Sequence, residues 1–285
     1  MFFGTGYYAP VALNVILTTV IAFVGRRIAV DQSIVTPPNG AFFFVFLILH
    51  PDITAWSTLV NAKDILVLTL HIFLLHSISL ASGKQYKKAL IFSGPTIFIL
   101  IFLRFYVPVL FVVALIPILI FHRKGISLWR LIVVSLATLM FFISGVGASA
   151  LNDAMDGIRS DFVNPAVGLV RFVLTPIPFN AEPSFEFLNI PSLVHWVLMP
   201  ALLGGAIKVA TIPTAFSRFF ILYFVTFVSL YSVYGELQGP RHRIQLDYAI
   251  ALFQFVGILM LANTIKQKRD IFSNSAASSR SIGSQ

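Results

Sequence analysis

Five short groups of polar residues stand at the ends of long apolar runs in this 285-residue sequence. The groups are His50-Pro51-Asp52, residues 61–64, Arg104-Phe105-Tyr106, residues 152–161, and residues 235–243. Arginine offers a planar fork of donors that matches phosphate oxygens in pairs, and lysine adds a point charge. A carboxylate at the edge of a low-dielectric cavity can act as a general base toward a sugar hydroxyl. These residue types indicate a site for an anion with a proton acceptor beside it.

The histidines and acids show no spacing typical of a metal site. His71 and His76 are five residues apart, whereas two ligands on one helical face are three or four apart, so we interpret them as packed or hydrogen-bonded. His195 stands beside Trp196, a combination typical of a membrane interface. The chain has no cysteine, which excludes disulfides and thiolate ligands. We therefore expect no metal and no cofactor.

Composition places most of the chain in lipid. It is 58% hydrophobic and 11% charged, with a mean hydropathy of +0.90. Soluble domains have about 25% charged residues, so the polar residues here are too few to cover a globular surface. The net charge of +9 is typical of basic cytoplasmic loops in a membrane protein, and we do not expect a nucleic-acid partner.

The apolar runs predict an all-α fold, a polytopic transmembrane helical bundle of about eight spans. A span needs about 20 residues. The runs cover residues 8–24, 41–60, 64–81, 89–121, 128–150, 192–210, 215–234 and 245–263. The run 89–121 would make a helix of about 50 Å, too long for a hydrocarbon core of about 30 Å. Because Arg104 and Pro108 interrupt it, we expect a hairpin of two short spans with Arg104 at the turn.

Loop charges predict the orientation. One set of loops carries 14 of the 20 basic residues and only Asp31 and Asp270 as acids. Since basic loops stay in the cytoplasm, the N-terminus is expected outside and the C-terminus in the cytoplasm. The domain prediction is a transmembrane domain over 1–265 with an external loop at about 151–191, an interfacial helix within it at 164–174, and a disordered cytoplasmic tail over 266–285.

All five polar groups fall on the outer side of this topology. Arginine and lysine at span ends commonly extend to lipid headgroups, and nearby acids pair with them, so a purely structural interpretation is available for each residue. Arg241, His242 and Arg243 are harder to explain in this way. Two arginines on the translocated side run against the orientation rule, which favours a function for this cluster.

Four segments between residues 41 and 265 add a resemblance. They are Pro51…Trp56-Ser57…Lys63-Asp64-Ile65, Leu103-Arg104-Phe105-Tyr106, Arg171-Phe172-Val173-Leu174-Thr175-Pro176-Ile177-Pro178-Phe179, and Tyr234-Gly235-Glu236…Arg241-His242-Arg243-Ile244. In order and spacing they resemble bacterial surface-polysaccharide membrane proteins, namely Wzy-like polymerases of O-antigen and oligosaccharide repeat units and C-type multispanning glycosyltransferases.

The resemblance implies a glycosyltransferase or polymerase on the outer face of the bacterial cytoplasmic membrane. Its substrate would be a polyprenyl-pyrophosphate-linked oligosaccharide, in which a sugar hydroxyl attacks the anomeric carbon and lipid pyrophosphate leaves. Arg104, Arg241 and Arg243 would hold the pyrophosphate charge. The substrate-binding candidates are Lys63, Arg104, Arg171, Arg241, His242 and Arg243, and the proton acceptor would be one of Asp64, Asp153 and Glu236. The expected partners are the lipid bilayer and other glycan-assembly membrane proteins.

Two other functional classes remain as alternatives. A lipid-linked glycan transporter would have charges buried at mid-bilayer and broken helices in paired halves, whereas the sequence shows no internal repeat and suggests no charge inside a span. A noncatalytic membrane assembly subunit would have the same topology with dispensable external charges.

Overall fold

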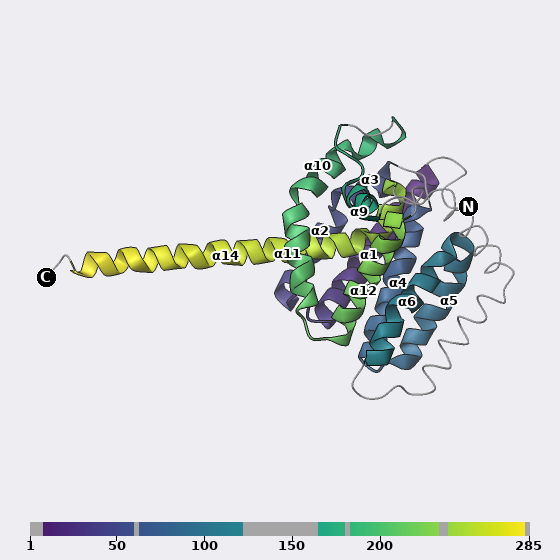
Figure 1. Cartoon of the computed structure of the whole chain (residues 1–285), viewed down its shortest axis with the longest axis horizontal. Coiled ribbons are helices and arrows are strands. Elements are labelled where there is room, and N and C mark those ends of the chain that lie inside the picture. Colours follow the sequence, from purple (N-terminus) through teal and green to yellow (C-terminus); the bar gives the residue numbers. More distant parts are fainter. Residues whose placement is uncertain (1–7, 60–62, 122–164, 180–182, 234–238, 283–285) are drawn as a thin grey trace.

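The computed structural model describes residues 8–59, 63–121, 165–179, 183–233 and 239–282, and every regular element in these ranges is a helix (Figure 1). The elements are α1 (Tyr8–Asp31), α2 (Pro37–Ile48), α3 (Pro51–Thr58), α4 (Asp64–Ser82), α5 (Tyr86–Arg104), α6 (Tyr106–Phe121), α9 (Pro165–Leu174), η1 (Pro183–Leu188), α10 (Asn189–Val197), α11 (Met199–Ala210), α12 (Ala215–Val233), α13 (Pro240–Arg243), η3 (Ile244–Leu246) and α14 (Asp247–Ile282).

The described part of the chain has the helices of a multi-pass membrane protein. Five are long and apolar enough to cross a bilayer, and the number rises to seven if each of two bent pairs counts as one span. On α5, Leu90, Phe98 and Phe102 expose 72%, 64% and 72% of their surface, which lipid would cover. The expected span at 128–150 lies outside the described residues. The eight runs, with 89–121 counted as two, add up to nine spans and not to eight, and ends on opposite sides also require an odd number.

The run 89–121 forms two helices, as predicted. α5 ends at Arg104 and α6 begins at Tyr106, with Phe105 between them. The beginning of α5 and the end of α6 lie together, because Tyr86 and Leu115 line one apolar cavity of about 360 Å³. The two helices are therefore an antiparallel hairpin with Arg104 at its turn.

Two runs that were expected to be single straight spans are broken. α2 and α3 meet at an angle of 45° around His50, and the helix that ends at Val197 meets α11 at 57°. Proline explains both breaks. Pro51 and Pro200 stand in the first turn of the following helix, where a missing N–H costs nothing. Pro51 also disfavours a helical conformation in His50, which is extended.

The α4 helix forms the centre of the bundle. In the most apolar stretch of α4, 72% of the residues are buried, compared with 17% in the corresponding stretch of α5. Its neighbours are α1, α5, α12 and η3, seen around it in Figure 1. His71, predicted to be packed or hydrogen-bonded, lies in this core with its Nδ1 2.9 Å from the hydroxyl oxygen of Tyr223. The first residue of α4 is Asp64, so this helix carries a carboxylate to one end of the core.

α14 is held against α11 at a backbone-to-backbone crossing. A Cβ atom on Gly205 would lie 1.8 Å from the carbonyl oxygen of Phe253, and one on Gly257 would lie 1.9 Å from that of Ala201. Small residues allow such close approach of helices in membranes. Beyond the crossing α14 leaves the bundle and continues to Ile282, so most of the tail expected to be disordered is helical. Between Gly257 and Ile282 the sequence contains no proline and no further glycine that would end the helix.

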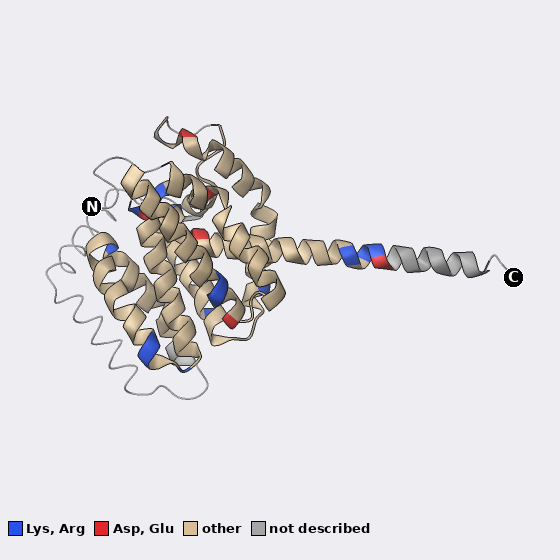
Figure 2. Ribbon diagram, turned by 180° about the vertical axis from the view of Figure 1, so that it is seen from behind, with Lys and Arg blue, Asp and Glu red and all other residues tan. Residues whose placement is uncertain are grey.

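Within the bundle the helix ends form two groups, and charged residues lie toward both of them, while a further charged stretch lies on the part of α14 that projects from the bundle (Figure 2). At one end, Gln32 after α1 donates to Ser79 near the end of α4. At the opposite end, Arg104 and Arg241 both contact Asp64. The grouping agrees with the loop alternation inferred from the charges. Over the described part of the segment 164–174, α9 forms the helix expected there.

The orientation itself remains a prediction, which reporter fusions test. A fusion after Lys88 or Lys124 should report a cytoplasmic position, and a fusion near Ser184 an external one, because the basic loops are retained inside. Alkaline phosphatase and fluorescent-protein reporters at each position provide opposite readouts and control for one another. A cytoplasmic signal near Ser184 would contradict the topology and place the Asp64 end of the bundle inside.

Candidate functional site

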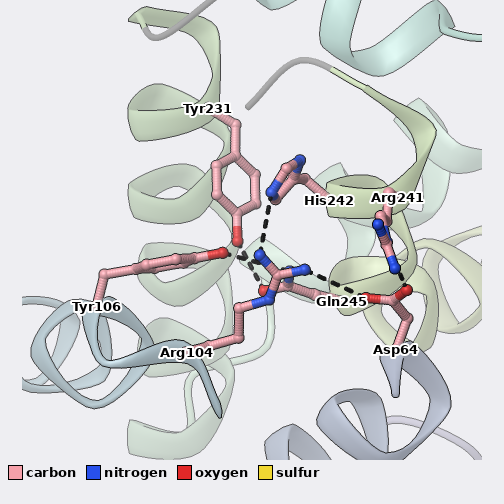
Figure 3. Close-up of polar contacts among 7 residues, drawn as sticks. All are labelled: Asp64, Arg104, Tyr106, Tyr231, Arg241, His242 and Gln245. Carbon is pink, nitrogen blue, oxygen red and sulfur yellow. Dashed lines mark hydrogen bonds and ion pairs between the residues drawn. The ribbon is translucent and has the colours of Figure 1, made fainter. Parts of the chain in front are cut away.

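Asp64 is the centre of a polar cluster at one end of the bundle (Figure 3). Its side chain has no exposed surface. Arg104 donates from Nη2 to Oδ1 at 3.3 Å, and Arg241 donates from Nε to Oδ2 at 2.9 Å. The carboxylate also lies in the first turn of α4, where the positive end of the helix dipole stabilises an anion. One buried acid thus holds two arginines that are 137 residues apart in sequence.

Local sequence brings each arginine to this point. Arg104 is the last residue of α5 and lies at the hairpin turn, so its side chain reaches the end of the bundle without crossing lipid. Arg241 belongs to the short helix α13, which Gly239 precedes and Pro240 begins. Proline is suited to the first position of a helix, and the turn it starts presents Arg241 toward Asp64.

His242 adds a ring whose protonation the geometry defines. Its Nε2 lies 3.4 Å from Arg104 Nη1, and a guanidinium nitrogen can only donate. The Nε2 atom therefore accepts, and the neutral ring carries its proton on Nδ1. That Nδ1 atom and the Nε atom of Arg104 are both buried and have no hydrogen-bond partner within the described part of the chain. The cluster thus contains two N–H donors that still need an acceptor.

A layer of aromatic and amide side chains packs against the cluster. The Tyr231 hydroxyl donates to Oε1 of Gln245 at 2.8 Å, and Nε2 of Gln245 donates to the Tyr106 hydroxyl at 3.4 Å. The rings of Tyr231 and His242 have their centroids 5.8 Å apart. Figure 3 shows these side chains converging from α6, α12 and η3 beside Arg104. This layer restricts the orientation of the imidazole and the guanidinium.

The charges of the cluster suit an anion. Two guanidinium groups face one carboxylate, and with a neutral His242 the sum is one positive charge. The Arg241 side chain is 52% exposed and the Arg104 side chain 17% exposed, so one arginine is open to the surface while the other is covered. Arginine forks bind phosphate and carboxylate in pairs of hydrogen bonds.

No family model, curated protein or solved structure matches this chain.

Arg243 does not join this cluster, contrary to the expectation that three arginines would hold one anion. It is 2% exposed and donates from Nη2 to Oδ1 of Asp52 at 3.0 Å, while its Nη1 donates to the backbone oxygen of Thr175. Successive residues of α13 and the following turn point in different directions, so Arg241 and Arg243 have different partners. Arg243 links α13 to α3 and to the segment after α9.

A chain of side-chain hydrogen bonds, not anticipated from the sequence, lies close to this ion pair. His50 donates from Nε2 to Oε1 of Gln254 at 3.0 Å, and Nε2 of Gln254 donates to Nδ1 of His195 at 3.3 Å. His195 in turn donates from Nε2 to the Val173 oxygen at 3.0 Å. His195 is 2% exposed, so its assignment to a membrane interface was wrong. The available signal was Gln254, an amide inside an apolar run.

The remaining candidates lie apart from the Asp64 cluster or outside the described residues. Lys63 is exposed next to Asp64. Arg171 is exposed on α9 and lines a groove of about 510 Å³ together with Leu174 and Trp196. Asp153 and Glu236 lie outside the described residues. Across the described ranges, no group of three His, Cys, Asp or Glu residues is arranged to hold a metal ion.

Proposed function

We propose that this protein assembles a surface glycan on the outer face of the bacterial cytoplasmic membrane, by transferring or polymerising a polyprenyl-pyrophosphate-linked oligosaccharide. The observation that carries the proposal is the pair of arginines on buried Asp64. Their surplus positive charge and the exposed guanidinium of Arg241 suit a diphosphate. The resemblance of the four segments supplies the substrate class.

The arginines would act on the leaving group. When the bond between the anomeric carbon and the diphosphate breaks, negative charge grows on the departing diphosphate. Donors that are already in position stabilise such charge without reorganising. Arg241, exposed at the surface, would meet the lipid-linked diphosphate first, and Arg104 with His242 would complete the contact. Asp64 neutralises one of the two positive charges before substrate binds and keeps the guanidinium groups from separating.

Asp64 is better suited to this positioning role than to proton transfer. Each of its oxygens already accepts an N–H from an arginine, and its side chain has no exposed surface that a sugar hydroxyl could approach. A general base must lie within hydrogen-bond reach of the proton that it removes. We therefore assign the base to Asp153 or Glu236, the two other acids identified from the sequence.

Replacing Arg241 or Arg104 with glutamine tests the proposal. Loss of one donor to a developing oxyanion lowers rates by about 10²–10³-fold, so we expect long glycan chains to disappear. Arg241→Lys should also fail, because an ammonium group cannot replace the planar fork. The readout is the chain-length distribution of the surface polysaccharide in cells whose only copy of the protein is the variant.

Arg27→Gln is the matched control. Arg27 pairs with Asp31 at 3.5 Å on the surface of α1, with side chains 56% and 50% exposed, at the other end of the bundle. This change should leave the chain length normal. Normal chains in both Arg104→Gln and Arg241→Gln, at normal levels of protein in the membrane, would contradict catalysis at this cluster and favour the noncatalytic assembly subunit.

A second candidate, a transporter of lipid-linked glycan, is favoured by the two broken helix pairs and by buried charges beside one of them. Both features are typical of a transporter, and the sequence predicted neither of them for this chain. The location of accumulated substrate separates the two functions. Loss of a polymerase leaves single repeat units on the outer leaflet, whereas loss of a transporter leaves them on the inner leaflet.

A further inference from the structure

The carboxyl group of Asp247 is buried without any hydrogen-bond partner. The residue begins α14, its side chain has no exposed surface, and neither oxygen has a partner in the described ranges. The candidate span begins at Pro240, seven residues before Asp247. At the rise of a helix, this places Asp247 about 10 Å into the span. A buried ionised carboxylate is strongly unfavourable unless it is paired. Asp247 therefore needs either a positive partner or a proton.

The charges around Asp247 do not provide a free positive partner. Asp52 and Arg243 lie close enough to act on it electrostatically. Arg243, however, already pairs with Asp52 at 3.0 Å, and both of these side chains are almost fully buried. Two carboxylates and one guanidinium sum to one negative charge. One monovalent cation would make this buried group neutral.

The other elements that pack near Asp247 bring no additional positive charge. α2 contains no titratable residue, and the only one in α11, Lys208, lies in its last turn. On α4, Asp64 is already paired with Arg104 and Arg241, His71 is hydrogen-bonded to Tyr223, and His76 lies about three turns along the helix from Asp64.

Beside the Asp52–Arg243 pair are His50 and His195. The hydrogen-bond chain through Gln254 keeps His195 neutral, because its Nδ1 accepts. The missing charge must therefore come from a bound cation, and a proton on His50 would still leave both Asp247 oxygens without a partner in the described ranges.

A proton suits this place better than a metal ion. A guanidinium beside the two carboxylates repels a metal ion, and the described ranges contain no set of three typical ligand residues. A proton needs only one oxygen. His50 also has a buried Nδ1 without a partner, so a second group near the pair can accept a proton.

We propose that Asp247, together with Asp52 and Arg243, forms a buried proton-binding site that holds one proton on the Asp247 carboxyl group. Binding forms one O–H bond and removes the negative charge of Asp247. Release returns the proton to water and leaves the three groups with a net charge of minus one. The site lies where α3 and α13 meet the start of α14, next to the break at His50, so its charge bears directly on the packing of that break. The proposal does not depend on the glycan chemistry.

Infrared spectroscopy of the full chain in phospholipid nanodiscs tests the site. At neutral pH the unchanged protein should show the carbonyl band of a protonated carboxylic acid, and this band should shift in D₂O. Asp247→Asn should remove it. Asp31→Asn, at a half-exposed acid paired with Arg27, should retain it. Absence of the band from the unchanged protein, or its persistence in Asp247→Asn, would overturn the proposal.

Two further measurements keep the test decisive if Asp247→Asn does not fold. Asp52→Asn should also remove the band, because Arg243 then faces Asp247 alone and stabilises its ionised form. A band that persists in Asp52→Asn would contradict the charge balance. Exchange of potassium for sodium at constant ionic strength should leave the band unchanged, and a sodium-dependent loss would assign the site to sodium instead of a proton.

Discussion

Arg243→Gln should destabilise the protein severely, whereas Arg241→Gln should leave its fold intact. Arg243 is 2% exposed, and removing it leaves the Asp52 carboxylate buried without its guanidinium. Breaking a buried pair in this way costs about 3–5 kcal/mol, a large part of the 5–15 kcal/mol that typically separates folded from unfolded states. The Arg241 side chain is 52% exposed, and its loss leaves the buried Asp64 carboxylate paired with Arg104, so we expect a smaller cost than for Arg243.

Thermal unfolding of the purified variants in detergent measures this difference, together with the amount of each variant in the membrane. The double variant Asp52→Asn/Arg243→Gln provides an internal check. It removes both charges, so it should be more stable than Arg243→Gln alone, and the coupling follows from the double-mutant cycle. Equal stability of Arg243→Gln and Arg241→Gln would mean that the buried pair does not support the fold.

Gly205→Ala should separate α11 from α14, whereas Gly204→Ala should be tolerated. The added methyl group at Gly205 would lie 1.8 Å from the carbonyl oxygen of Phe253, and backbone cannot rotate aside as a side chain can. Overpacking of this kind costs about 1–3 kcal/mol or more. A Cβ atom on Gly204 meets nothing within 4 Å, so this neighbour isolates the effect of the crossing from that of helix propensity.

The midpoint of thermal unfolding compares the two alanine variants under identical conditions. Gly257→Ala should behave like Gly205→Ala, since its Cβ would lie 1.9 Å from the Ala201 oxygen on the same crossing. The site should respond as well, because α14 follows directly from α13 and η3, which carry Arg241 and Gln245. An unfolding midpoint for Gly205→Ala equal to that of Gly204→Ala would contradict the close approach of these helices.

The sequence alone determined the class of fold and the position of several helices. Apolar runs of sufficient length predict spans because lipid cannot satisfy backbone polar groups outside a helix. Arg104 inside such a run predicted the hairpin, because a charge at mid-bilayer is costly. Asp64 and the arginines at 104 and 241 were correctly expected at one level, since loop order alone assigns them to the same side. The breaks at Pro51 and Pro200 were readable from these prolines but were missed, because each run is long enough for one span.

Only the tertiary structure decided which charges pair. Arg241 and Asp64 are 177 residues apart, Arg243 and Asp52 are 191 apart, and His50 and Gln254 are 204 apart. Spacing along a chain describes one helix and its faces, whereas these pairs depend on how several helices pack around α4. Two arginines separated by a single residue therefore have different surroundings, one at the surface and the other buried. The burial of Asp247 follows from the same packing, and no local pattern in its apolar run reveals that its carboxyl group lacks a partner.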